Sequence, residues 1–164
     1  MKTAIVYYSM SGNTKYVVDK IADEIKASGE VDIIRIEPKK AYPDKGAKKF
    51  FWGGKSAVMG EKPKLLPYEF DADKYDRIII GTPVWASTFV PPIRTFLQEH
   101  KDMTDKKWAV VACFSGGGAD KAIEKLKSFI GIEEFEAELI LVNPKDNQKP
   151  EDEEKIRAFC RALK

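Results

Sequence analysis

Residues 3–36 have the sequence TAIVYYSMSGNTKYVVDKIADEIKASGEVDIIRI, which predicts a β-strand, a helix and a second β-strand. β-Branched and aromatic side chains dominate residues 3–8, as expected of a buried strand. The helix that follows has an apolar face made of Val17, Val18, Ile21, Ala22 and Ile25. Residues 31–36 predict the second strand, which ends before Pro38. Such a βαβ unit requires parallel strands and a right-handed crossover.

The same alternation of strands and helices continues to the end of the chain. The patterns predict strands at residues 76–81, 107–113 and 135–142 and helices at residues 91–100, 119–130 and 151–163. Four acidic residues open the last helix, where they complement the positive end of its dipole. Five strands that alternate with helices predict a three-layer, doubly wound α/β sheet.

The connection between the second and third strands, residues 38–75, is longer than a crossover requires and is rich in Gly and Pro. An approximate helical spacing predicts a helix near residues 44–59, and its members are Ala47, Phe50, Phe51, Gly54, Ala57 and Val58. We expect Trp52 to be a core residue of this helix and residues 60–73 to be irregular. Connections of this length are often functional.

Length and composition favour one domain that spans residues 1–164. Hydrophobic residues make up 43% of the chain and charged residues 33%, which is typical of a globular protein. The net charge of +2 gives no reason to expect a nucleic-acid partner. The chain shows no signal-peptide pattern and no run of about 18 apolar residues, so we expect no membrane span and a cytoplasmic location.

The cysteines and the histidine exclude several kinds of site. Cys113 and Cys160 lie far apart and form no CxxC motif or Cys/His cluster, which argues against zinc and iron–sulfur sites. We expect both cysteines to be reduced core residues. His100 is the only histidine, and we expect it on the surface. A single surface histidine argues against a Ser-His-Asp or Cys-His catalytic group.

Three distinctive loops follow strands of the predicted sheet. They are residues 9–14 (SMSGNT), residues 82–88 (TPVWAST) and residues 114–118 (FSGGG). Ligands of parallel α/β sheets bind beyond the carboxyl ends of the strands, where neighbouring crossovers diverge. The loops therefore predict one shared site.

The first loop has the features of a phosphate site. It combines hydroxyls with a glycine directly before a helix, whose free backbone N–H groups favour an anion. N-capping by Asn13 or Ser11 alone would explain one polar residue but not the whole set. We therefore expect a phosphate at Ser9, Ser11, Asn13 and Thr14.

Other phosphate-binding motifs are missing. The first loop contains only Gly12, so it matches neither the P-loop nor the dinucleotide fingerprint. A Cys-x5-Arg phosphatase motif fails because Ala119 stands where the arginine belongs. A receiver domain would need acidic residues at the ends of the first and third strands, and this chain has none there.

In these loops the chain resembles the flavodoxin family. Residues 7–14 (YYSMSGNT) are similar to the family's FMN phosphate loop, residues 81–85 (GTPVW) with 91–97 (PPIRTFL) to its second flavin loop and the next helix, and residues 114–117 (FSGG) to its third loop. The resemblance implies a flavodoxin-like sheet of strand order 2-1-3-4-5 that binds FMN non-covalently. The FMN-binding residues that it implies are Ser9, Met10, Ser11, Gly12, Asn13, Thr14, Thr82, Pro83, Val84, Trp85, Ala86, Phe114, Ser115, Gly116, Gly117 and Gly118.

Trp85 has two interpretations. A loop tryptophan at the carboxyl end of a strand can offer its face to a planar ring, so the resemblance implies that it packs against the flavin. The alternative is that Trp85 only fills the crevice between the loops.

The resemblance implies an electron carrier that shuttles electrons between a reductase and an acceptor protein and has no catalytic residues. An NAD(P)H-dependent FMN or quinone reductase of the same fold stays open, and so does a binding module that uses the phosphate loop for another ligand. The reductase remains an alternative because of residues 39–64, which hold eight lysines against Asp44 and Glu61. This positive charge could steer an anionic partner or a nicotinamide phosphate. Residues 133–154 are acidic instead, with nine Asp and Glu against two lysines.

Overall fold

The architecture follows a computed structural model, which describes the backbone of residues 1–164 and every side chain except that of Phe50. The strands are β1 (Lys2–Tyr7), β2 (Glu30–Arg35), β3 (Arg77–Trp85), β4 (Thr88–Phe89), β5 (Lys107–Phe114) and β6 (Ala137–Val142). The helices are α1 (Asn13–Lys26), α2 (Gly46–Val58), α3 (Pro91–Glu99), α4 (Ala119–Ile130) and α5 (Pro150–Ala162), with one 3₁₀ turn at Ala72–Lys74. The predicted alternation of strands and helices is confirmed.

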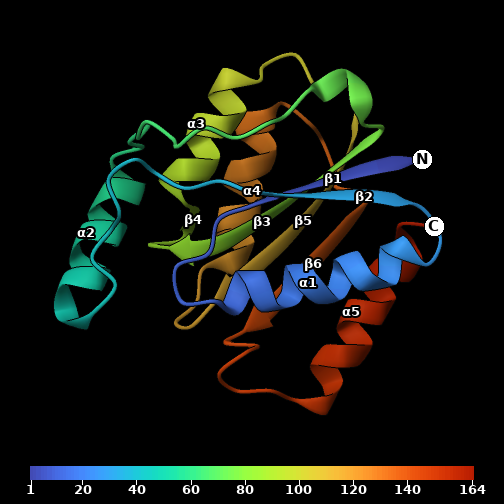
Figure 1. The fold of residues 1–164 in the computed structure, drawn as a ribbon. Helices are drawn as coiled ribbons and strands as arrows, with labels where there is room; N and C mark the ends of the chain where they lie inside the picture. Colours follow the sequence, from blue (N-terminus) through green and yellow to red (C-terminus); the bar gives the residue numbers. More distant parts are fainter.

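The five long strands form a parallel sheet of order β2-β1-β3-β5-β6 (Figure 1). Because β5 and β6 are the fourth and fifth long strands, this is the predicted order 2-1-3-4-5. In the centre of the sheet, Ile5 of β1 lies between Ile33 of β2 and Ile79 of β3. The chain leaves β1 and β3 in opposite directions, so a crevice is expected at their carboxyl ends.

Alternate residues of the strands pack against two different helical layers. Ile5 and Ile79 belong to an apolar cluster with residues of α1 and α5. Val6 and Ile80 belong to a second cluster with residues of α3 and α4. Since successive side chains of a strand point to opposite faces, the sheet lies between the two helical layers, as the three-layer prediction requires (Figure 1).

The third strand is longer than predicted. β3 continues through residues 82–85, which were expected to be loop, and a tight turn at Ala86 and Ser87 leads into the antiparallel β4. These two residues have φ angles of 50° and 58°, the left-handed geometry of a type I′ hairpin turn. Such turns favour Asn and Gly, and the sequence Ala-Ser therefore does not indicate a hairpin.

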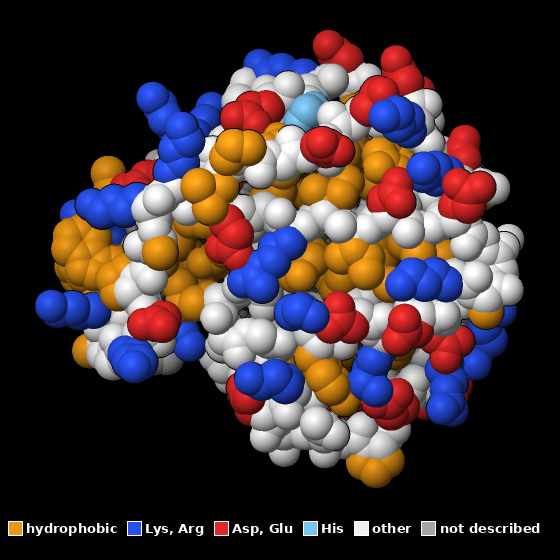
Figure 2. All heavy atoms as spheres, in the orientation of Figure 1, with side chains coloured by type: hydrophobic (Ala, Val, Ile, Leu, Met, Phe, Trp, Pro, Cys, Tyr) orange, Lys and Arg blue, Asp and Glu red, His pale blue; other side chains and the backbone are white. Residues whose placement is uncertain are grey.

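Helix α2 lies apart from the two helical layers, beside the hairpin of β3 and β4 (Figure 1). Small residues make up its buried side: Gly53, Ser56 and Ala57. A Cβ atom at Gly53 would lie 3.2 Å from the ring of Trp85, so the missing side chain permits this close approach. The large apolar residues Phe51, Trp52, Val58 and Met59 are 48% to 70% exposed, and Figure 2 shows this apolar surface bordered by lysines.

The prediction that Trp52 is a core residue is therefore wrong. Apolar side chains at helical spacing usually mark the buried face, but in α2 the small residues are the ones that pack. The side chain of Phe50, which belonged to the predicted spacing, lies outside the described residues. Residues 60–73 are irregular as predicted, and Leu66 donates its N–H to the carbonyl of Glu37 at 2.8 Å.

His100 is half-buried rather than freely exposed. Its ring contacts those of Phe70 and Phe96, and its Nε2 lies 2.9 Å from the hydroxyl of Tyr68. This burial lowers the pKa of His100 below its usual value.

Cys113 and Cys160 are buried and unpaired, as predicted. Among the described side chains, no group of three or more His, Cys, Asp or Glu could hold a metal ion. No helix in the described part of the chain is long and apolar enough to cross a membrane.

Candidate functional site

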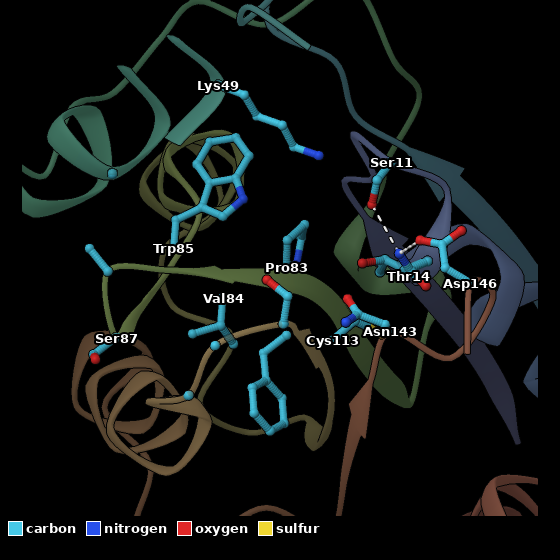
Figure 3. Close-up of a pocket in the computed structure, with 17 residues that line it drawn as sticks. Ser11, Thr14, Lys49, Pro83, Val84, Trp85, Ser87, Cys113, Asn143 and Asp146 are labelled. Atoms are coloured by element: carbon cyan, nitrogen blue, oxygen red, sulfur yellow. Dashed lines mark hydrogen bonds between the residues drawn. The ribbon is translucent and has the colours of Figure 1, made fainter. Parts of the chain in front are cut away.

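A cavity of about 590 Å³ opens where β1, β3 and β5 end (Figure 3). Members of all three predicted loops line it: Ser11, Asn13, Thr14, Pro83, Val84, Trp85, Ala86, Phe114, Ser115, Gly116 and Gly117. Ser87 of the second loop also lines the cavity, although it was not among the expected FMN-binding residues. Five further lining residues lie outside the three loops and were missed from the sequence: Lys49, Gly54, Cys113, Asn143 and Asp146. The three loops thus meet at one cavity, and α2 and the turn after β6 supply two additional walls.

The first loop leads into α1 without a side-chain cap. Gly12 precedes the helix with a φ of 91°, in the left-handed region that suits glycine. Gly12 is the N-cap residue and has no side chain, so N-capping by Asn13 or Ser11 does not explain this loop. In the first turn, the N–H of Lys15 donates to the buried Oγ of Ser9 at 3.2 Å. The start of α1 therefore presents backbone donors beside the cavity.

Three residues of the first loop do not line the cavity themselves. Ser9 is buried and supports the start of α1. Met10 packs against the apolar cluster under α3 and α4. Gly12 faces Lys145, because a Cβ atom at Gly12 would lie 3.2 Å from the Lys145 Nζ. These three residues shape the loop, while Ser11, Asn13 and Thr14 form its cavity side.

Asn13 joins the first loop to the turn after β6. Its Nδ2 donates to Ser11 Oγ at 3.1 Å and to Asp146 Oδ2 at 2.8 Å. Its Oδ1 accepts from the backbone N–H of Lys145 at 2.9 Å. A residue near the start of the chain thus fixes a segment that lies more than a hundred positions later.

The hairpin of β3 and β4 forms the second wall. Thr82 is buried and does not line the cavity; its hydroxyl donates to the carbonyl of Pro83 at 2.7 Å and accepts from the N–H of Val90 at 3.3 Å. Gly118, before α4, also lies outside the lining, and a Cβ atom there would come within 2.2 Å of Ser87 Oγ. Thr82 and Gly118 therefore hold the hairpin and α4 in position.

Trp85 lines the cavity in a fixed orientation (Figure 3). Its ring lies edge to face with Tyr8, at a centroid distance of 5.8 Å, and with Tyr42, at 5.2 Å. Gly53 of α2 approaches the same ring. These contacts restrain the indole while leaving it half-exposed at the cavity.

The third wall is mostly backbone. Ser115, Gly116 and Gly117 are exposed, and a Cβ atom at either glycine would have no other atom within 4 Å. A flat ligand could therefore approach this backbone closely. Cys113 borders the cavity from below, and burial raises the pKa of its thiol to about 12, so this thiol is uncharged.

Charges reach the cavity only from outside the three predicted loops. Figure 3 shows Lys49 of α2 pointing toward the cavity, and Asp146 lies opposite, after β6. The pKa of Asp146 is lowered, chiefly by the hydrogen bond from Asn13 and then by the charges of Lys145 and Lys49. The rule that ligands bind beyond strand ends could have indicated Asn143 and Asp146, because they follow the fifth long strand. The contribution of Lys49 depends on the placement of α2, which no local pattern specifies.

Solved flavoprotein structures share this fold. A flavoprotein of Lactobacillus acidophilus in complex with FMN is 24% identical with a TM-score of 0.66, and the match covers 88% of this chain and 95% of that one. The flavodoxin of Megasphaera elsdenii is 19% identical (TM-score 0.60; 97% and 98% covered), and that of Streptococcus pneumoniae is 16% identical (TM-score 0.61; 99% and 97% covered). At these identities the similarity establishes the fold.

No curated protein matches the chain. The family model described as Flavodoxin matches residues 2–149, which is most of the chain and includes all three loops and the turn after β6. Together with the sheet order and the cavity at the ends of β1 and β3, this match shows that the chain belongs to the flavodoxin family.

Proposed function

We propose that this protein binds FMN non-covalently in the cavity and carries electrons between redox partner proteins. One observation carries the proposal: the start of α1, where the N-cap Gly12 has no side chain, lies with the polar side chains of Ser11, Asn13 and Thr14 at a cavity whose other walls come from β3 and β5. Backbone donors at a helix start favour a phosphate group. The adjoining walls then have to hold the rest of the ligand.

The chemistry of the cavity fits FMN. Its volume of about 590 Å³ lies within the range of about 300–1,000 Å³ that is usual for small-molecule sites. Ser11, Asn13 and Thr14 would hold the phosphate, whereas Trp85 and the backbone at Gly116 and Gly117 would hold the ring. The Lactobacillus acidophilus flavoprotein, which has the same fold, was solved with FMN.

Bound FMN would supply the redox chemistry, since a flavin accepts and releases one or two electrons. The protein would contribute binding, orientation and the electrostatic environment. The third wall is exposed at Ser115, Gly116 and Gly117, which would allow a partner protein to come close to the cofactor. This exposure favours an electron carrier, because transfer to a partner requires proximity and no separate substrate pocket.

The test begins with the apoprotein, prepared by unfolding, cofactor removal and refolding. We expect added FMN to bind with strong quenching of its fluorescence, and a colourless protein that does not respond to FMN would contradict the cofactor assignment.

The holoprotein is then mixed anaerobically with NADPH. A carrier stays oxidised until a flavin-dependent NADPH reductase is added. Rapid bleaching by NADPH alone would contradict the carrier role and favour the reductase.

A further inference from the structure

The turn at residues 143–147, between β6 and α5, packs against the first loop. Besides the hydrogen bond that Asn13 donates to Asp146 and the one that it accepts from the backbone of Lys145, Lys145 Nζ donates to the carbonyl of Ser11 at 3.0 Å. Lys145 Nζ also lies 3.4 Å from Asp146 Oδ1. A cation and an anion therefore lie beside a loop whose own residues, 9–14, carry no charge.

Asp146 accepts a hydrogen bond from the side-chain amide of Asn13, a donor that a phosphate would also need. The side-chain amide of Asn13 has two N–H bonds to donate. One goes to Ser11 Oγ and the other to Asp146 Oδ2. A phosphate oxygen can accept from Asn13 only if it replaces one of these acceptors, and Asp146 is the one that would repel it.

Lys145 has the opposite effect. A phosphate monoester carries a charge of about −1.5 to −2 near neutral pH. The ammonium group of Lys145 lies at the outer side of the loop, next to Ser11 and Gly12, and stays on the protein surface. Its field attracts the phosphate, and it partly neutralises Asp146 as well.

We infer that Lys145 and Asp146 set the preference of this site for FMN over riboflavin, with opposite signs. Lys145 supplies the positive charge that the loop lacks. Asp146 is a built-in competitor for the amide of Asn13 and lowers the affinity for the phosphate. The inference rests on the proposed function, because it concerns the phosphate of the same cofactor.

The two effects are measured by titrating apoprotein with FMN and with riboflavin, which lacks the phosphate, at low and high ionic strength. We expect Asp146→Asn to tighten FMN binding and Lys145→Gln to weaken it, each by about two- to fivefold, the usual range for an exposed charge pair. Riboflavin binding should stay within error of the wild type. Asparagine offers Asn13 a neutral oxygen, which is a weaker acceptor than a carboxylate, so Asp146→Asn removes the repulsion and lets the phosphate displace the acceptor more easily.

Further variants separate charge from structure. Lys145→Arg should retain wild-type affinity for FMN, because it keeps the charge and a donor. Lys149→Gln, which removes an exposed lysine just before α5, serves as the matched control and should change neither ligand. The difference between wild type and Lys145→Gln should shrink at high salt, because exposed charges are screened.

Two results would overturn the inference. One is an equal change in the affinity for FMN and for riboflavin in Asp146→Asn or in Lys145→Gln. The other is weaker FMN binding in both variants. Either result would mean that the turn acts only as a scaffold. A wild-type protein that binds neither flavin would instead contradict the proposed function itself.

Discussion

At the scale of single residues, Ser11 is one of two hydroxyl residues of the first loop that line the cavity, the other being Thr14 (Figure 3). We expect Ser11→Ala to weaken FMN binding about tenfold, because a hydrogen bond to a charged group contributes roughly 1.5–3 kcal/mol and water replaces part of it. Riboflavin binding should change little. Fluorescence titration of the apoprotein measures both affinities, and Ser128→Ala on the exposed side of α4 is the control. Equal losses for the two flavins would show that Ser11 does not contact the phosphate.

Trp85 is expected to act on the ring of the cofactor. Trp85→Ala should weaken both FMN and riboflavin and restore part of the flavin fluorescence, since an adjacent aromatic ring contributes about 0.5–1.5 kcal/mol beyond burial. Trp52→Ala is a matched control, because Trp52 is 48% exposed on the outer side of α2. The fluorescence yield of the saturated complex is the measurement. Unchanged quenching in Trp85→Ala would mean that Trp85 only fills the crevice.

Local sequence was sufficient to place part of the first loop at the cavity, and the binding of FMN by these residues stays a prediction. Ser11, Asn13 and Thr14 follow a strand and begin a helix, so their position depends on neighbours in the chain. Lys145 and Asp146 were not predicted, although they contact the same loop, because their contact with Asn13 exists only after the whole sheet has formed. Local patterns therefore indicate a helix-start site but not the distant segments that complete it.

At the scale of elements, an ion pair joins the start of β3 to the start of β6. Arg77 donates to Glu136 from Nε at 2.6 Å and from Nη2 at 2.8 Å, and Lys107 of β5 lies 3.5 Å from the same carboxylate. The side chain of Arg77 is only 5% exposed. The hydrogen bonds from Arg77 lower the pKa of Glu136 below its usual value of 4.5.

We expect Glu136→Gln to reduce the free energy of unfolding by about 1–2 kcal/mol at neutral pH, less than for a fully buried pair because Glu136 is partly exposed. A carboxylate with a lowered folded-state pKa stabilises the protein above its unfolded-state pKa and loses this contribution as the pH falls through the folded-state value. The difference between variant and wild type should therefore shrink below about pH 4.5. Urea unfolding at several pH values measures it. Glu154→Gln removes an exposed pair with Arg161 and should have no measurable effect, so a similar loss in both variants would contradict this explanation.

Elements whose patterns follow ordinary packing were predicted well, and two were not. The parallel sheet follows from buried strands that alternate with amphipathic helices, as in β1 and α1. The β3–β4 hairpin was missed because Ala86 and Ser87 adopt positive φ angles without the residues that usually mark them. The packed side of α2 was predicted only in part: Ala57 is buried, but Phe51 and Trp52 are exposed, because the packed side is made of small residues such as Gly53. In both cases contacts with other elements outweigh local preference.

At the scale of the whole molecule, positive charge is concentrated on one side of the cavity. Residues 39–64 include eight lysines and two acidic residues. Helix α2 lies within this segment and contributes Lys49 and Gly54 to the cavity lining, and Figure 3 shows Lys49 pointing toward the cavity. A small anion approaching the cofactor would therefore meet an attractive potential. The overall charge of +2 does not reveal this asymmetry.

We expect the reduced holoprotein to react with the anion ferricyanide more slowly as ionic strength rises. The cation cobalt(III) hexaammine should show the opposite trend, because salt screens both attraction and repulsion. Stopped-flow absorbance measures the two rates. The double variant Lys48→Gln and Lys55→Gln should flatten both salt dependences, whereas Lys121→Gln on α4 should leave them unchanged. A ferricyanide rate that rises with salt would contradict a positive potential at the cofactor.

The bonds between Asn13 and the turn at residues 143–147 also bear on protein synthesis. The ribosome makes the first loop more than a hundred residues before it makes the turn that packs against this loop. A nascent chain that has reached only β5 therefore has its phosphate loop without the partners that hold it in place. The complete pocket is available for cofactor uptake only once residue 146 has emerged from the ribosome, so FMN binding has to follow the synthesis of this distant turn.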